Sequence, residues 1–173
     1  LDKKNGEILR SIPTEESIFK NKFINNLAVF KNDIIFLNTY GSLYSLNNKS
    51  MKINWVVNLN QSYDFNPSNL FLSNQLTISD NRIYIPTNNN FYSLDLRTGM
   101  TIFKKNFTSG LKPLVLSDII YTINNNLLIG TELKSGRIIF SIDINEKVSE
   151  FYKIKKKELY FKHLIYADNK IFI

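Results

Sequence analysis

The amino-acid sequence predicts an all-β fold in which one unit of four short antiparallel strands is repeated. The hexapeptide at 80–85, Asp-Asn-Arg-Ile-Tyr-Ile, returns almost unchanged at 168–173 as Asp-Asn-Lys-Ile-Phe-Ile. A turn also recurs four times, at spacings of about 45, 48 and 37 residues, which are typical of propeller blades. The third positions of these turns are Gly6, Met51, Gly99 and Gly136.

Each unit is expected to begin with a short apolar strand, a tight turn and a second strand. We expect the first strands at 27–30, 76–79, 114–116 and 163–167. The turn before the second strand carries Asp or Asn in every copy, and these residues tolerate the left-handed backbone of tight turns. A side chain that recurs at one repeat position is interpreted as structural. The residues concerned are Asn32, Asp33, Asp80, Asp118 and Asp168.

The third strand of each unit is expected to end in a second, outer turn. Its copies lie at 41–47 and 89–95, with a less similar copy at 126–132. Asp2 and Asp95 occupy the position before the turn, where a side-chain oxygen can accept hydrogen bonds from the turn's backbone N–H groups. Glycine at Gly6, Gly99 and Gly136 allows a positive φ. Met51 departs from this rule, so its turn is expected either to differ or to be strained.

The fourth strand carries a large residue four positions beyond the turn glycine. We expect these strands at 52–59, 101–107 and 137–144, because the runs are β-branched and aromatic with partial alternation. A bulky residue once per blade is predicted to pack against the neighbouring blade. Arg10 in this position predicts a degenerate first blade, or a stem that packs with its charged head in solvent. The other three are Trp55, Phe103 and Phe140.

Four antiparallel strands per unit, arranged radially, are the blades of a β-propeller. Residues 1–173 are therefore predicted to form one propeller segment, with about three full blades and parts of others. Because both ends of the chain fall inside a repeat, we expect it to be a fragment of a larger ring.

We predict no catalytic, cofactor-binding or metal-binding residue in this sequence. It contains no cysteine, and His163 is its single histidine, so thiolate and multi-histidine sites are excluded. The carboxylates recur at turn positions or lack a partner at fixed spacing, and no phosphate loop or EF-hand pattern occurs. No run of about 18 apolar residues is present.

Two long stretches rich in aromatic residues are the candidate interaction loops: 63–71 and, within the connection 145–162, residues 151–161. The second holds the one dense lysine cluster, at 153–157, in a chain of net charge +7, and it is expected to form an exposed strand or a short helix against the ring. Basic and aromatic residues together suit single-stranded nucleic acid, but no RNP, OB or KH signature occurs, so we predict no nucleic-acid partner. Both loops are also compatible with covering blade edges. The candidate residues are Tyr63, Phe65, Phe71, Phe151, Tyr152, Lys155, Lys156 and Lys157.

Residues 94–103, Leu-Asp-Leu-Arg-Thr-Gly-Met-Thr-Ile-Phe, resemble the quinoprotein (PQQ-like) repeat, and 1–6 and 133–140 are similar to weaker copies. One branch of this superfamily, the quinone-dependent dehydrogenases, implies pyrroloquinoline quinone, calcium, a catalytic Asp and a Trp platform. None of these can be placed on this sequence. The other branch, the BamB-like outer-membrane assembly lipoproteins, implies an eight-bladed, non-enzymatic ring that docks on the β-barrel assembly machinery.

From this resemblance we expect a non-catalytic interaction scaffold in the periplasm of a Gram-negative bacterium, associated with the outer membrane. Its partner would be a protein, and membrane contact would come only through a lipid anchor outside this segment. The chain replaces the repeat Trp in three of four copies, which separates it from typical BamB-like sequences. A segment of a quinoprotein dehydrogenase and a propeller sensor domain of a signalling protein remain the alternatives.

Overall fold

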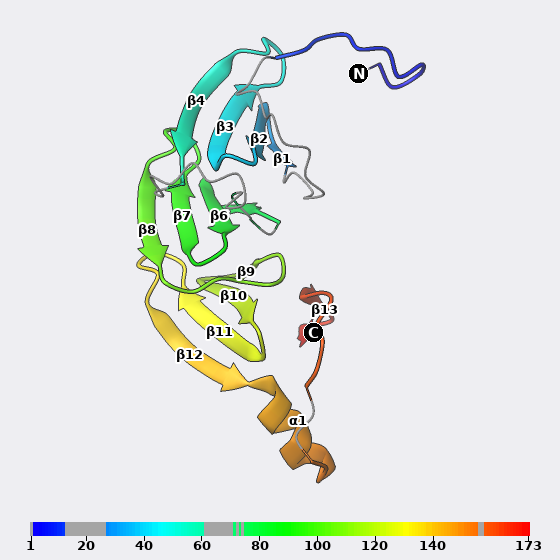
Figure 1. Ribbon diagram of the computed structural model, residues 1–173, viewed down its shortest axis with the longest axis vertical. Coiled ribbons are helices and arrows are strands. Elements are labelled where there is room, and N and C mark those ends of the chain that lie inside the picture. Colours follow the sequence, from blue (N-terminus) through cyan, green and yellow to red (C-terminus); the bar gives the residue numbers. More distant parts are fainter. Residues whose placement is uncertain (1, 13–26, 61–70, 72, 74, 156–157) are drawn as a thin grey trace.

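A computed structural model describes residues 2–12, 27–60, 71, 73, 75–155 and 158–173. In these residues the fold is almost entirely β, with three four-stranded antiparallel sheets, one two-stranded sheet and one short helix (Figure 1). The predicted all-β propeller segment is therefore confirmed. The helix, α1 (Ile144–Tyr152), is too short to cross a membrane, and no other helix among the described residues is long and apolar enough to do so.

The strands of every sheet lie side by side in sequence order, as expected for propeller blades. The first blade contains β1 (Leu27–Phe30), β2 (Asp33–Leu37), β3 (Ser42–Asn47) and β4 (Ile53–Asn58). The second contains β5 (Thr77–Ser79), β6 (Arg82–Pro86), β7 (Phe91–Asp95) and β8 (Thr101–Lys105). The third contains β9 (Leu114–Leu116), β10 (Ile119–Asn124), β11 (Leu127–Glu132) and β12 (Ile138–Asp143). After α1 (Ile144–Tyr152), the chain forms the pair β13 (Ile165–Ala167) and β14 (Lys170–Phe172).

The three full blades follow one another along an arc (Figure 1). Strands β4, β8 and β12 run along its outer side. On the inner side the first strand of each blade contacts the first strand of the next, β1 with β5 and β5 with β9. This radial order is the one predicted from the repeat.

The hydrophobic core lies between blades. One cluster joins the first two blades and includes Ile35, Leu43, Ile83 and Leu94, all with 0% exposure. A second cluster joins the second and third blades. Each sheet is thus buried by its neighbour, which makes blade-to-blade contact the main source of apolar burial. The second cluster contains Tyr84, Phe91, Phe103, Ile120 and Leu133.

The repeated Asp-Asn dipeptide forms the same hairpin turn in both copies. Asp80 and Asn81 have φ of 48° and 59°, and Asp168 and Asn169 have φ of 48° and 57°. Two consecutive positive φ values define a type I′ turn, which matches the twist of the flanking strands and favours Asn and Asp. Residues 80–85 and 168–173 are therefore similar because each stretch forms this turn and the strand that follows it.

All four outer turns adopt one conformation. The N–H groups of Gly6, Met51, Gly99 and Gly136 each donate to the carbonyl oxygen four residues earlier, at 2.8–2.9 Å. Met51 has φ of 57°, in the same left-handed region as the three glycines. Of the two outcomes expected for this turn, the structure shows the strained one, since a side chain in this region carries a conformational cost.

Candidate interaction surface

Trp55 and Phe103, the large residues of β4 and β8, dock on the turn glycine of the next blade. A Cβ atom built on Gly99 would lie 2.7 Å from Trp55 Cε3, and one built on Gly136 would lie 2.7 Å from Phe103 Cγ. The indole N–H of Trp55 also donates to the Leu96 carbonyl at 3.1 Å. Glycine at these turns thus serves two needs, a positive φ and room for the neighbouring ring.

The first and fourth copies of the large residue make different contacts. The Arg10 guanidinium donates to the Lys49 carbonyl at 2.8 Å, so its charged head reaches the turn of the first blade. Phe140 instead lies over Gly130 in its own blade, 6.0 Å from the ring of Tyr121. Phe140 therefore fills the space left by a glycine within the sheet.

The caps predicted for the outer turns are present. Asp95 Oδ1 accepts from the backbone N–H groups of Arg97 and Thr98 at 2.9 and 2.8 Å, and from the Thr98 hydroxyl at 2.9 Å. Burial raises the pKa of the Asp95 carboxyl, but these hydrogen bonds favour the charged form and lower its pKa overall. Asp2 accepts one such bond, from Lys4 N–H at 2.7 Å.

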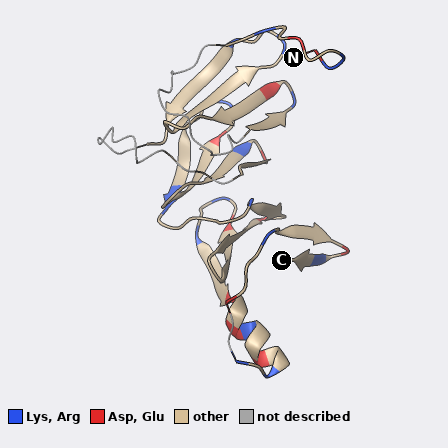
Figure 2. Cartoon of the chain, turned by 45° about the vertical axis from the view of Figure 1, so that its right-hand side comes forward, with Lys and Arg blue, Asp and Glu red and all other residues tan. Residues whose placement is uncertain are grey.

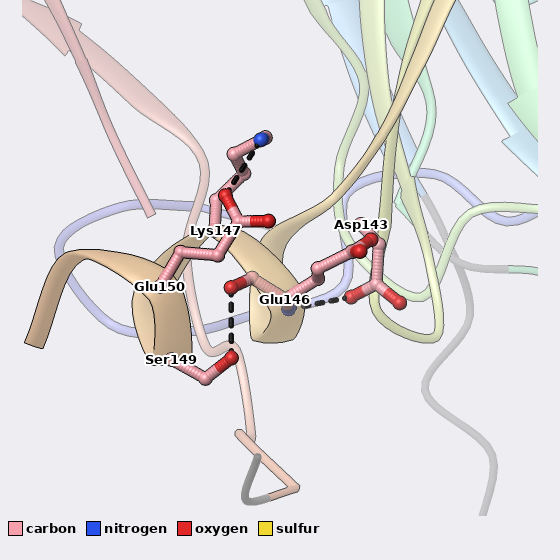
Figure 3. A network of polar contacts seen from close by, with 5 residues as sticks. All are labelled: Asp143, Glu146, Lys147, Ser149 and Glu150. Atoms are coloured by element: carbon pink, nitrogen blue, oxygen red, sulfur yellow. Dashed lines mark hydrogen bonds and ion pairs between the residues drawn. The ribbon is translucent and has the colours of Figure 1, made fainter. Parts of the chain in front are cut away.

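The connection after the third blade begins as a capped helix (Figure 3). Asp143 Oδ1 accepts from the Glu146 N–H at 3.0 Å, which satisfies a free donor of the first turn. The Ser149 hydroxyl donates to the Glu146 carbonyl at 2.9 Å, and the Lys147 ammonium pairs with Glu150 at 2.8 Å. Glu150 raises the pKa of Lys147. The strand predicted at 137–144 therefore ends at Asp143, because that side chain caps α1.

The end of α1 forms an exposed tip of aromatic and basic residues, which we call the α1 tip and define as residues 151–155. Phe151 is 79% exposed and Tyr152 is 65% exposed. Their rings pack edge to face, with 5.0 Å between the ring centroids. Lys153 ends the helix with φ of 53°, and Lys155 is exposed. The helix extends away from the blades (Figure 1) and carries both signs of charge (Figure 2).

The remaining loop candidates are placed differently. Phe71 is partly buried and packs against the core of the first two blades, so its ring contributes to packing. Its N–H donates to the Thr39 carbonyl at 3.0 Å. Tyr63, Phe65, Lys156 and Lys157 lie outside the described residues.

A cavity of about 310 Å³ lies where the third blade meets the connection after α1. It is lined by the turn between β10 and β11, the loop at 110–111, the first turn of α1 and residues 158–161. Sequence reasoning missed this cavity, because its lining comes from four segments with no common motif.

The described residues do not fit a quinone and calcium site. Among them, no group of three His, Cys, Asp or Glu side chains comes together. Trp55, the one tryptophan, lies against Gly99 with its N–H already bonded, so it offers no free platform for a quinone.

Neither the known protein-family models nor the curated protein sequences contain a match to this chain. Solved structures do resemble it. BamB from Moraxella catarrhalis is 16% identical with a TM-score of 0.56, over 72% of this chain and 38% of that one. A europium-containing methanol dehydrogenase is 16% identical with a TM-score of 0.54, over 67% of this chain and 24% of that one.

The computationally designed protein Ika4 is 11% identical with a TM-score of 0.60, over 92% of this chain and 91% of that one. At these identities the likeness concerns the fold alone, a β-propeller. The chain spans less than half the length of the BamB and the dehydrogenase that it matches.

Proposed function

We propose that this chain is part of a non-catalytic scaffold that assists the assembly of outer-membrane β-barrel proteins, in the manner of BamB. The observation that carries the proposal is the α1 tip on a propeller frame: an exposed, capped helix end with two aromatic rings and lysines. Exposed aromatic side chains on a rigid element are typical anchors of protein interfaces. The likeness to BamB supports this reading at the level of the fold.

In this proposal the propeller holds the α1 tip in a fixed position, and a protein partner covers Phe151 and Tyr152. Burying two aromatic side chains supplies much of the binding energy of a small interface. The lysines of the tip favour a partner surface with acidic residues, since complementary charge speeds encounter. The place of action would be the periplasm, at the outer membrane.

A quinoprotein dehydrogenase is the second candidate, because its members share the fold at comparable TM-scores. Among the described residues, no group of three His, Cys, Asp or Glu side chains comes together to hold its metal ion. For that candidate to hold, the quinone and calcium ligands would have to come from residues other than those described.

The test is capture of partners from native envelopes with the tagged chain, read by mass spectrometry. We expect β-barrel assembly subunits to be recovered, and a Phe151→Ser/Tyr152→Ser variant to lose them. Met100→Ser is the matched control, since Met100 is 71% exposed on the outer turn of the second blade. Loss of partners in the control as well, or capture unchanged by the tip variant, would contradict the proposal. Dye reduction with added quinone and calcium would support the dehydrogenase.

A further inference from the structure

The cavity beside the third blade has walls that are fixed by hydrogen bonds. The buried Ser109 hydroxyl donates to the Leu111 carbonyl at 2.7 Å and accepts from the Ile123 N–H at 3.2 Å. Gly110 N–H donates to the Ile123 carbonyl at 2.7 Å, and Ile144 N–H to the Asn126 carbonyl at 2.9 Å. The loop at 109–111, the end of β10 and the start of α1 are therefore joined as one rigid frame.

Asn145 lines this cavity and is 6% exposed. Its Oδ1 atom is buried and has no hydrogen-bond partner in the protein. A buried amide oxygen left unpaired costs free energy, and a ligand hydroxyl that rotates the amide toward the cavity would recover it.

The other lining side chains narrow the class of ligand. Asn125 and Asn126 bring two more amides to the same cavity, and each amide both donates and accepts. Two aromatic residues also line the cavity, Tyr160, which is 83% exposed, and Phe161, which is half-buried. The described lining contains one charged residue, the exposed Glu158.

A sugar has hydroxyl groups that can pair with the amides of the cavity, and an apolar face that can pack on its aromatic rings. A hydroxyl is also both donor and acceptor, and the C–H face of a pyranose suits an aromatic ring. The volume of about 310 Å³ is at the small end of ligand pockets, large enough for one or two rings. We propose that this cavity binds a neutral saccharide of one or two rings.

The site does not depend on the α1 tip, so the two proposals can fail separately. The probes are a panel of neutral monosaccharides and disaccharides, with glucose, N-acetylglucosamine, maltose and chitobiose as the first set. Binding to the full chain is followed by saturation-transfer NMR and by titration of amide shifts. Tyr160→Ala is expected to weaken binding by about tenfold, the order of one lost ring contact. Tyr152→Ala is the matched control, because Tyr152 lies on the tip, outside the cavity lining.

Asn145→Leu removes the unpaired oxygen at similar size and is expected to abolish binding. Tyr160→Ala keeps the test informative should that buried change unfold the chain. Binding of a panel sugar that Tyr160→Ala weakens and Tyr152→Ala leaves unchanged supports the proposal. No binding by any of these sugars, equal binding by both tyrosine variants, or preference for a tripeptide over every sugar would overturn it.

Discussion

Replacing Gly99 by alanine tests whether blade-to-blade docking depends on the turn glycine. The left-handed φ of 73° costs a side chain about 1–2 kcal/mol. The new Cβ would also meet the Trp55 ring at 2.7 Å, and such overpacking typically costs about 1–3 kcal/mol. We therefore expect Gly99→Ala to lower the free energy of unfolding by about 2–5 kcal/mol. For a chain of this size the midpoint temperature would fall by about 4–20 °C.

The two contributions separate in a double-mutant cycle measured by urea unfolding. In a Trp55→Ala background the ring is gone, so Gly99→Ala should cost only the conformational part, about 1–2 kcal/mol. Gly6→Ala is the matched control, because its φ is 74° and no atom lies within 4 Å of the Cβ position. Equal costs of Gly99→Ala with and without Trp55, within about 0.5 kcal/mol, would refute the docking argument.

The remaining predictions concern the same repeat. Phe103→Ala should cost about 3–5 kcal/mol in urea unfolding, because its ring is buried between the second and third blades, and a cost under about 1 kcal/mol would contradict this packing. Met51→Gly should stabilise the chain by about 1 kcal/mol by relieving the left-handed φ of 57°, and a lower melting temperature would show that the methionine side chain contributes more than its strain. The lowered pKa of Asp95 stabilises the fold above the pKa of the unfolded carboxyl, and this contribution is lost as the pH falls through the folded pKa. Stability should therefore decline below about pH 4, and Asp95→Asn should flatten that decline, since Asn47 already caps the turn of the first blade. An unchanged acid profile would exclude Asp95 as its source.

Much of the fold could be predicted because each blade repeats the same local rules. Turn chemistry fixed the hairpin at Asp80 and Asn81, and the alternating runs fixed the strands beside it. The strand ends in the structure differ from the predicted ends by one or two residues. One example is Asp143, where the side chain caps α1 and the predicted strand ends. The helix itself was one of two forms expected for the connection after the third blade.

Long-range contacts were harder to predict. A bulky residue in each fourth strand indicated contact with another blade, but its spacing does not show that the partner is the glycine of the next outer turn. The cavity could not be predicted from the sequence, because its lining residues come together only through tertiary structure. They include Gly110, Asn126, Asn145 and Tyr160. Linear motifs find sites on one segment, whereas this one depends on four.

The third blade breaks the docking rule of the repeat, and the candidate sites described above lie beside it. Phe140 turns back onto Gly130 in its own sheet, whereas Trp55 and Phe103 dock on the next blade. The strand that carries Phe140 leads directly into α1, its exposed tip and the wall that holds Asn145. Local rules are usually violated where function requires it. The departure of the third blade from the repeat is therefore a physical reason to search for binding there first.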